Sequence, residues 1–173
     1  MGPDEQPPAD ERLLAMYRQA LPHVYGYLLP RCGSAAVAED LAAETFEAAV
    51  AAIRQRDVPD LSIAWLLGIA RHKLADHWRR SAREQRGLAA VTQDCIVQED
   101  PWEGWLDAQL AHAALARLPV PQRAALTLRY LDGLPVAEVA AYLGRSVHAT
   151  ETLLVRSRAA LRSVYLGEVD DGH

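Results

Sequence analysis

Apolar residues in this chain recur three or four positions apart, which is the spacing of an α-helix, and long β-branched runs are absent. Half of the 173 residues are hydrophobic (50%), and alanine and leucine, both good helix formers, dominate that half. Aromatic residues make up only 6% of the chain. These features predict an all-α protein.

The helical pattern falls into two blocks, which predict two small helical domains joined by a flexible linker. Residues 1–10 are rich in proline and acid and are expected to form a disordered arm. The first domain is expected to span residues 11–86 and the second residues 105–166. Between them, residues 87–104 lack a regular spacing of apolar residues and contain glycine, proline and clustered acidic residues. Residues 167–173, after the second domain, form an acidic tail.

No sequence feature indicates a membrane protein, a metalloprotein or an enzyme. A twenty-residue apolar span and a basic-then-apolar leader are both absent, so we expect a cytoplasmic protein without direct membrane insertion. Cys32 and Cys95 have no partner at metal spacing, which favours unreactive thiols. His72 and His77 do not share a helix face, which argues against a metal pair. Phosphate-binding loops and catalytic motifs are absent, so no cofactor, metal or catalytic residue is expected.

Charge is distributed unevenly along the chain, although the formal net charge is −5. Residues 92–107 hold five acidic side chains and no basic one, and both ends of the chain are acidic as well. The rest of the chain is net positive. An acidic protein of this kind can therefore still present a basic surface to nucleic acid.

Residues 136–155 have the pattern of a helix-turn-helix. Apolar residues share one face of the first helix, where the small Ala140 allows a close helix crossing. Gly144 stands where the chain must leave that helix, because the left-handed position after a helix favours glycine. Ser146 can then cap the second helix by accepting a backbone hydrogen bond.

The second helix of this motif would enter the major groove of DNA by its N-terminal end, with Thr150, Leu153 and Leu154 facing its partner helix. Its arginines would contact phosphates, whereas Glu151 and Thr152 would read base edges, since a carboxylate accepts from a cytosine amino group. The predicted contacts to duplex DNA are Arg145, Ser146, His148, Glu151, Thr152, Arg156 and Arg158. A solvated amphipathic helix in a small bundle is the alternative for this segment.

The first domain contains a helix with two apolar stripes and an acidic ridge. Within residues 37–53, one stripe includes Leu41 and a second, roughly opposite, includes Phe46. Asp40 and Glu44 lie between them on the ridge. We expect one side to pack in the core and the other to bind a partner, with solvated charges beside a core as the alternative.

Residues 63–86 combine an apolar stripe with dense positive charge. The stripe runs from Ile63 to Trp78 and is expected to lie in the core. Residues 71–86 hold six basic and two acidic side chains. Trp65 lies off the stripe, where it either packs against another helix or offers its face to an unstacked base.

Three motifs together resemble the extracytoplasmic-function sigma factors, the smallest class of bacterial sigma-seventy-type initiation factors. They are AEDLAAETF, WLLGIARHKLADHWRR, and ALARLPVPQRAALTLRYLDGLPVAEVAAYLGRS followed by LLVRSRAALR. The resemblance covers about residues 12–164, in the order of the family. It implies that the first domain is sigma region 2 and the second is sigma region 4.

The resemblance also implies partners and roles. The acidic helix would dock on the largest-subunit clamp of core RNA polymerase, through Asp40, Leu41, Glu44 and Phe46. The basic helix would open and hold the minus-ten promoter element, through Trp65, Arg71, His72, Lys73, Arg79 and Arg80. The helix-turn-helix would read the minus-thirty-five element, and its domain would contact the flap of the second-largest subunit. An anti-sigma factor, often membrane-anchored, usually silences such proteins, so we expect one that can hold this protein at the membrane.

The chain departs from the family pattern at several of these positions. Ala43 stands where many members have glutamine in the polymerase-binding motif, which removes one polar contact. His72 replaces a common asparagine, and Pro135 replaces a common capping serine. Glu151 replaces a frequent basic residue in the recognition helix, so the promoter sequence of other members cannot be transferred to this chain.

Two other functions fit parts of the sequence. A free-standing helix-turn-helix regulator would use only the second domain for DNA and the first for sensing or dimerisation. A decoy that titrates a partner would account for Ala43. The cationic, aromatic helix at residues 63–86 argues against the regulator, and the basic helices in both halves argue against the decoy.

Overall fold

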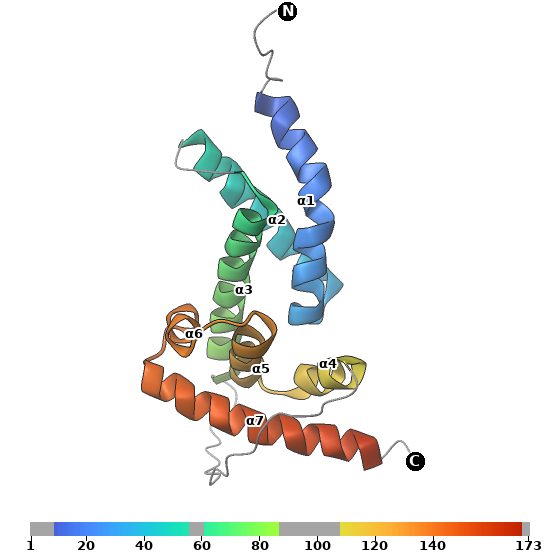
Figure 1. Cartoon of the computed structure of the whole chain (residues 1–173), viewed down its shortest axis with the longest axis vertical. Helices are drawn as coiled ribbons and strands as arrows, with labels where there is room; N and C mark the ends of the chain where they lie inside the picture. Colours follow the sequence, from blue (N-terminus) through green and yellow to red (C-terminus); the bar gives the residue numbers. More distant parts are fainter. Residues whose placement is uncertain (1–8, 56–60, 87–107, 171–173) are drawn as a thin grey trace, which may run out of the picture. The chain divides into compact units, whose positions relative to one another are not determined.

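The computed structural model describes residues 9–55, 61–86 and 108–170 of the chain. Within these ranges the regular structure is entirely helical and no strand occurs, which confirms the predicted all-α fold (Figure 1). The predicted linker over residues 87–104 lies outside the described residues. Among the helices that are described, none is both long enough and apolar enough to cross a membrane.

The chain forms two compact units, Met1–Leu74 and Ala75–His173. The first unit contains α1 (Ala9–Cys32), α2 (Ala35–Arg54) and the first half of α3 (Ile63–Arg86). Helices α1 and α2 pack against each other. The boundary between the units falls inside α3, so this helix contributes to both.

The turn between α1 and α2 explains why these segments do not form one long helix. Gly33 has a φ of 69°, a left-handed conformation that glycine adopts without steric cost. Ser34 is extended, and its hydroxyl accepts a hydrogen bond from the Val37 backbone N–H at 3.4 Å, which starts α2. Val24 and Leu28 of α1 are fully buried and form part of the core.

Helix α2 buries residues of both stripes expected from its sequence. Phe46 of the second stripe is only 8% exposed, and its ring meets the Tyr17 ring of α1 edge-on, with centroids 4.7 Å apart. Leu41 and Thr45 of the first stripe are buried too. Tyr17 therefore covers Phe46, so this residue of the second stripe packs against α1.

Helix α3 buries most of the stripe predicted for it. Leu66, Ala70, Leu74 and Trp78 are each at most 1% exposed. Trp65, which lies off the stripe, is half-buried. The apolar period therefore identified the core side of this helix correctly over its central turns.

The second unit is built on α7 (Val147–Asp170), which contacts α4 (Ala108–Arg117), α5 (Val120–Leu126) and α6 (Val136–Leu143) (Figure 1). A short π-helix, η1 (Thr127–Leu131), follows α5. The aliphatic core among these helices includes Ala114, Leu115, Leu118, Ala125, Leu126, Leu154 and Leu161. Apolar residues of these helices thus pack against α7.

The turn between α6 and α7 has the geometry predicted for a helix-turn-helix. Gly144 has a φ of 63° and a ψ of 40°, and the Arg145 N–H donates to the Ala140 carbonyl at 2.9 Å, which closes the end of α6. The Ser146 hydroxyl accepts from the Ala149 N–H at 3.2 Å and so caps α7. Both predicted roles are confirmed.

The π-helix η1 was not indicated by the sequence. Its wide turn is closed by the Asp132 N–H, which donates to the Thr127 carbonyl at 3.0 Å. The chain then reverses at Gly133, whose φ is 69°. Arg129 Nη1 donates to the Leu134 carbonyl at 3.0 Å and holds the segment leading into α6. Such single π-turns occur often at functional sites.

Candidate nucleic-acid and polymerase interfaces

The N-terminal half of α7, with the turn before it, presents a polar surface to solvent. Its exposed predicted contacts are Arg145, Ser146, His148, Glu151, Thr152 and Arg156. On the inward side of the helix, Thr150 is fully buried and Leu154 is 6% exposed. The helix therefore has the inner and outer faces that its sequence predicts.

Hydrogen bonds orient several side chains on this surface. Thr152 Oγ1 donates to the His148 carbonyl at 3.1 Å, so its oxygen lone pairs are left to accept from a ligand. Arg158 is half-buried, and its Nη1 donates to the Tyr130 hydroxyl of η1 at 3.4 Å. Arg158 is thus held against η1, whereas Arg156 is exposed on α7.

Most of the predicted single-strand contacts on α3 lie on one side of the helix. Trp65, His72 and Arg79 are seven residues apart and therefore share a face. Arg80 adjoins Arg79 and is exposed. Arg71 differs, because it lies on another side of the helix and its Nε atom is inaccessible to solvent.

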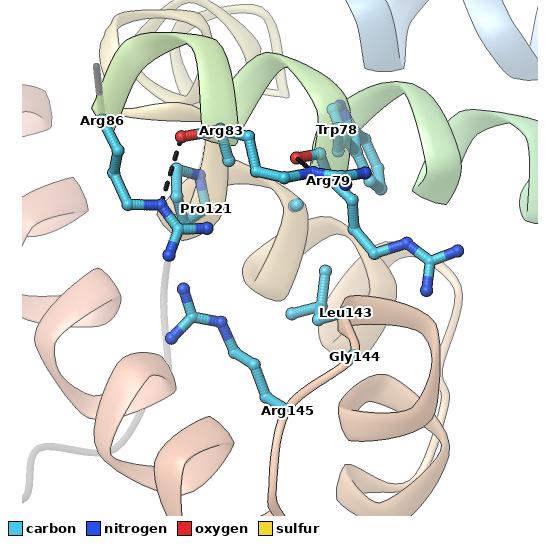
Figure 2. A pocket seen from close by; sticks show the side chains of 10 residues that line it. Trp78, Arg79, Arg83, Arg86, Pro121, Leu143, Gly144 and Arg145 are labelled. Atoms are coloured by element: carbon cyan, nitrogen blue, oxygen red, sulfur yellow. Dashed lines mark hydrogen bonds between the residues drawn. The ribbon is translucent and has the colours of Figure 1, made fainter. Parts of the chain in front are cut away.

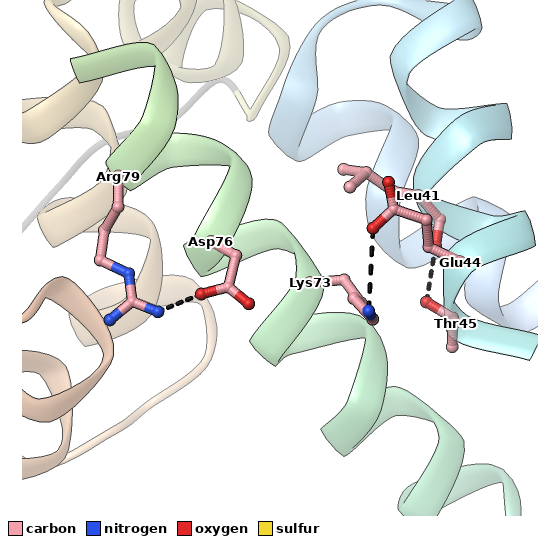
Figure 3. Close-up of polar contacts among 6 residues, drawn as sticks. All are labelled: Leu41, Glu44, Thr45, Lys73, Asp76 and Arg79. Atoms are coloured by element: carbon pink, nitrogen blue, oxygen red, sulfur yellow. Dashed lines mark hydrogen bonds and ion pairs between the residues drawn. The ribbon is translucent and has the colours of Figure 1, made fainter. Parts of the chain in front are cut away.

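Two ion pairs involve cationic side chains of α3 (Figure 3). Lys73 Nζ lies 3.8 Å from Glu44 Oε2 of α2, and both side chains are partly exposed, so the pair contributes little to stability. Arg79 pairs with Asp76, one turn earlier on the same helix. A phosphate that binds either cation must displace its carboxylate or share the cation with it.

The predicted polymerase contacts on α2 divide into surface and core residues. Asp40 is exposed, and Glu44 is half-buried beside Lys73. Leu41 and Phe46 are only 2% and 8% exposed. A partner that docks on this helix would meet the two carboxylates, while the two apolar side chains hold the helix in place.

A cluster of arginines in the second unit was not predicted from the sequence. Arg83 and Arg86, which end α3, line a pocket of about 340 Å³ together with Arg79 and Arg145 (Figure 2). The spacing of three to four residues on α3 was visible in the sequence, but the approach of Arg145 was not. The described residues contain no group of three His, Cys, Asp or Glu side chains that could hold a metal ion.

Two known families match successive parts of the chain. Residues 16–84 match the family described as Sigma-70 region 2, and residues 108–161 match the one described as Sigma-70, region 4. The first range includes all the predicted contacts on α2 and α3. The second includes all those on α7 and the turn before it.

Individual proteins give the same result. The chain is 36% identical to the ECF RNA polymerase sigma factor BldN of Streptomyces coelicolor over 152 residues, 82% of this chain and 56% of BldN, so it spans little more than half of that relative. It is 33% identical to the ECF RNA polymerase sigma factor SigF of Caulobacter vibrioides over 152 residues, 85% of this chain and 84% of SigF.

A solved structure supports the fold. The sigma factor RpoE of Bartonella quintana, crystallised with the anti-sigma factor NepR, aligns with a TM-score of 0.53 at 23% identity, over 89% of this chain and 96% of RpoE. The two region matches and the similarity to nearly the full length of SigF agree with this arrangement of helices. The chain belongs to the ECF RNA polymerase sigma factors.

Proposed function

We propose that this chain directs promoter-specific transcription initiation, by binding core RNA polymerase and both elements of a promoter. The observation that carries the proposal is the exposed surface of α7, which begins at the Gly144 turn and the Ser146 cap. Such a surface suits the major groove of DNA. Membership of the family supports the same role.

The two halves of the chain have separate roles. Residues 11–86 act as sigma region 2 and residues 105–166 as sigma region 4, with the acidic residues 87–104 joining them. Arg145 and Arg156 contact phosphates of the minus-thirty-five element, which gives affinity without sequence preference. Neighbouring side chains that accept or donate hydrogen bonds then read the bases.

The exposed side of α3 suits a single strand. Trp65 provides an aromatic surface for a base, while Arg79 and Arg80 attract the phosphates on either side. Strand opening then needs no input of chemical energy. The protein binds bases that have already unstacked and so shifts the equilibrium toward the open form of the DNA. Arg79 would exchange Asp76 for a phosphate as the strand binds.

Protein partners follow from the same assignment. Asp40 and Glu44 of α2 would meet the clamp of the largest polymerase subunit, and sigma region 4 would contact the flap of the second-largest subunit. An anti-sigma factor would hold the protein inactive in the cytoplasm or at the membrane until a signal releases it. Repeated co-purification from the native host that never yields such a partner would contradict this last proposal.

Transcription on a fragmented genomic library with purified core polymerase tests the function directly. RNA start sites are mapped with the full chain, without it, and with a variant that lacks residues 1–86. New starts that depend on the full chain and share two upstream motifs are the expected result. The truncated variant should give none, because it lacks the helices assigned to polymerase binding and strand opening.

Other outcomes would favour the other functions. Protein-dependent starts that persist without residues 1–86 would contradict the division of roles between the two halves. Absence of new starts together with tight, specific binding to duplex DNA would replace the proposal with a free-standing regulator. Absence of both activities would leave a decoy that titrates a partner.

The salt dependence of promoter binding tests the role of Arg156. Replacing it with alanine should weaken binding on all promoters and lower the slope of log K against log salt concentration by about 0.9, since one phosphate contact is lost. The measurement is a titration of promoter fragments with holoenzyme at several salt concentrations. Arg18→Ala, which removes an exposed charge from α1, is the control and should leave the slope unchanged. An equal effect of both variants would show a general charge effect.

A further inference from the structure

A cationic pocket lies within the second compact unit, Ala75–His173. Its volume is about 340 Å³, which is at the lower end of the range for small-molecule sites. Four arginines line it, and none of the described residues that line it is acidic. The four are Arg79, Arg83, Arg86 and Arg145. Arg79 pairs with Asp76, whereas the other three arginines form no ion pair with the described residues and can bind an anion.

The guanidinium groups approach the pocket from two segments of the chain. Figure 2 shows those of Arg86 of α3 and Arg145 of the α6–α7 turn pointing toward one another. The turn also comes close to Arg79, because a Cβ atom on Gly144 would lie 3.6 Å from Arg79 Nη1. Like charges that converge in this way repel one another unless an anion lies between them.

Backbone hydrogen bonds hold two of these side chains in place. Arg83 Nε donates to the Arg79 carbonyl at 3.1 Å, and Arg86 Nε donates to the Ala82 carbonyl at 3.3 Å. Neither arginine forms an ion pair with the residues that the structure describes. Their terminal amino groups are therefore held in position and remain available to an anion, which lowers the entropic cost of binding one.

Trp78 lines the pocket and is only 1% exposed, so it contributes apolar ring surface to the wall. Pro121 and Leu143 add apolar surface to the same walls.

We infer that this pocket binds a chain of linked phosphates, either as an inorganic oligophosphate or as the phosphate chain of a nucleotide. Guanidinium groups recognise phosphate oxygens in paired hydrogen bonds, so several arginines match several linked phosphates. One orthophosphate offers four arginines fewer oxygens and less negative charge than a triphosphate does. The ligand is thus selected by the number of its phosphates, and apolar surface beside them is available to a nucleotide ring.

Binding at this site has a consequence that rests on the proposed function. Arg79 and Arg145 are assigned to the minus-ten and minus-thirty-five elements, respectively. An oligophosphate bound between Arg86 and Arg145 competes with promoter DNA for the Arg145 guanidinium. The pocket therefore couples promoter binding to the concentration of a small phosphorylated molecule.

Calorimetric titration of the full chain tests the site, with orthophosphate, inorganic triphosphate and ATP as the probes. One molecule of triphosphate or ATP should bind per chain, at least about tenfold more tightly than orthophosphate. The double variant Arg83→Gln/Arg86→Gln should weaken this binding by about tenfold or more. A matched double variant, Arg18→Gln/Arg54→Gln, removes two exposed charges from α1 and α2 and should bind as the unmodified chain does. Circular dichroism verifies that both variants are folded.

Each outcome decides the proposal. Equal affinity for triphosphate and ATP identifies the phosphate chain alone as the ligand, and tighter binding of ATP identifies a nucleotide. Absence of binding, an equal loss in both double variants, or no preference over orthophosphate would overturn the site. Neither DNA nor polymerase is present, so a negative result would leave the proposed role in transcription intact. Given binding, triphosphate should displace promoter DNA from the unmodified holoenzyme and not from the Arg83→Gln/Arg86→Gln form.

Discussion

Replacing Leu28 with alanine should remove a large part of the stability of the first compact unit. Leu28 is fully buried in α1, which packs against α2. Its truncation leaves a cavity and should lower the free energy of unfolding by about 2–5 kcal/mol. Because domains of this size are stable by only about 5–15 kcal/mol, this is a substantial fraction. Hydrogen exchange of the α1 and α2 backbone amides in the full chain measures the decrease in the free energy of unfolding of this unit.

The adjacent residue provides the control for this measurement. Leu29 is 36% exposed on the same helix, and its replacement with alanine removes the same number of atoms. Leu29→Ala should lower the free energy of unfolding by less than Leu28→Ala does, because Leu29 is partly exposed already and its truncation leaves no enclosed cavity. Equal losses from both variants would show that α1 does not pack as described.

Reversing the charge of Asp40 should weaken binding to core polymerase by about tenfold or more. Asp40 is exposed on α2 and forms no ion pair with the described residues, so lysine can replace it with little effect on folding. If the polymerase surface is complementary to a carboxylate, a lysine at this position loses the original contact and adds like-charge repulsion. Competition with an unmodified, labelled chain for core polymerase measures the change.

Glu39→Lys is the matched control for Asp40→Lys. Glu39 is also exposed, and it precedes Asp40 on α2 but points about 100° away around the helix. The two variants have the same net charge, so a general charge effect would change both affinities equally. A loss confined to Asp40→Lys places the interface on the predicted side of the helix. An unchanged affinity of Asp40→Lys would remove this residue from the polymerase surface.

Local patterns in the sequence were sufficient to predict most of the fold. The apolar period identified the buried side of α3, because one stripe of a helix determines which side packs. Gly144 and Ser146 predicted the α6–α7 turn, since a left-handed glycine and a capping serine act on their immediate neighbours. Ser157 was not predicted to lie in the core. It is fully buried, and its hydroxyl is satisfied there because it donates to the Leu153 carbonyl of its own helix at 2.6 Å.

Features that depend on contacts between distant residues could not be predicted. Phe46 is buried because Tyr17, in another helix, covers it. The pocket of arginines depends on the approach of Arg145 to the end of α3, and no local pattern encodes that approach. The exposed residues of α7 were predicted correctly as surface, but their sequence preference depends on DNA contacts that the chain alone does not contain.

The separation of core and surface on α7 affects how such a protein can diversify. Thr150 and Leu154 secure the helix from one side, whereas His148, Glu151 and Thr152 are exposed on the other. Exposed substitutions of this kind typically change stability by less than about 0.5 kcal/mol. If α7 reads promoter DNA as proposed, duplicated copies of the gene can acquire new promoter preferences without first acquiring compensating mutations in the core. Many regulators of this type could then share one polymerase and still control separate sets of genes.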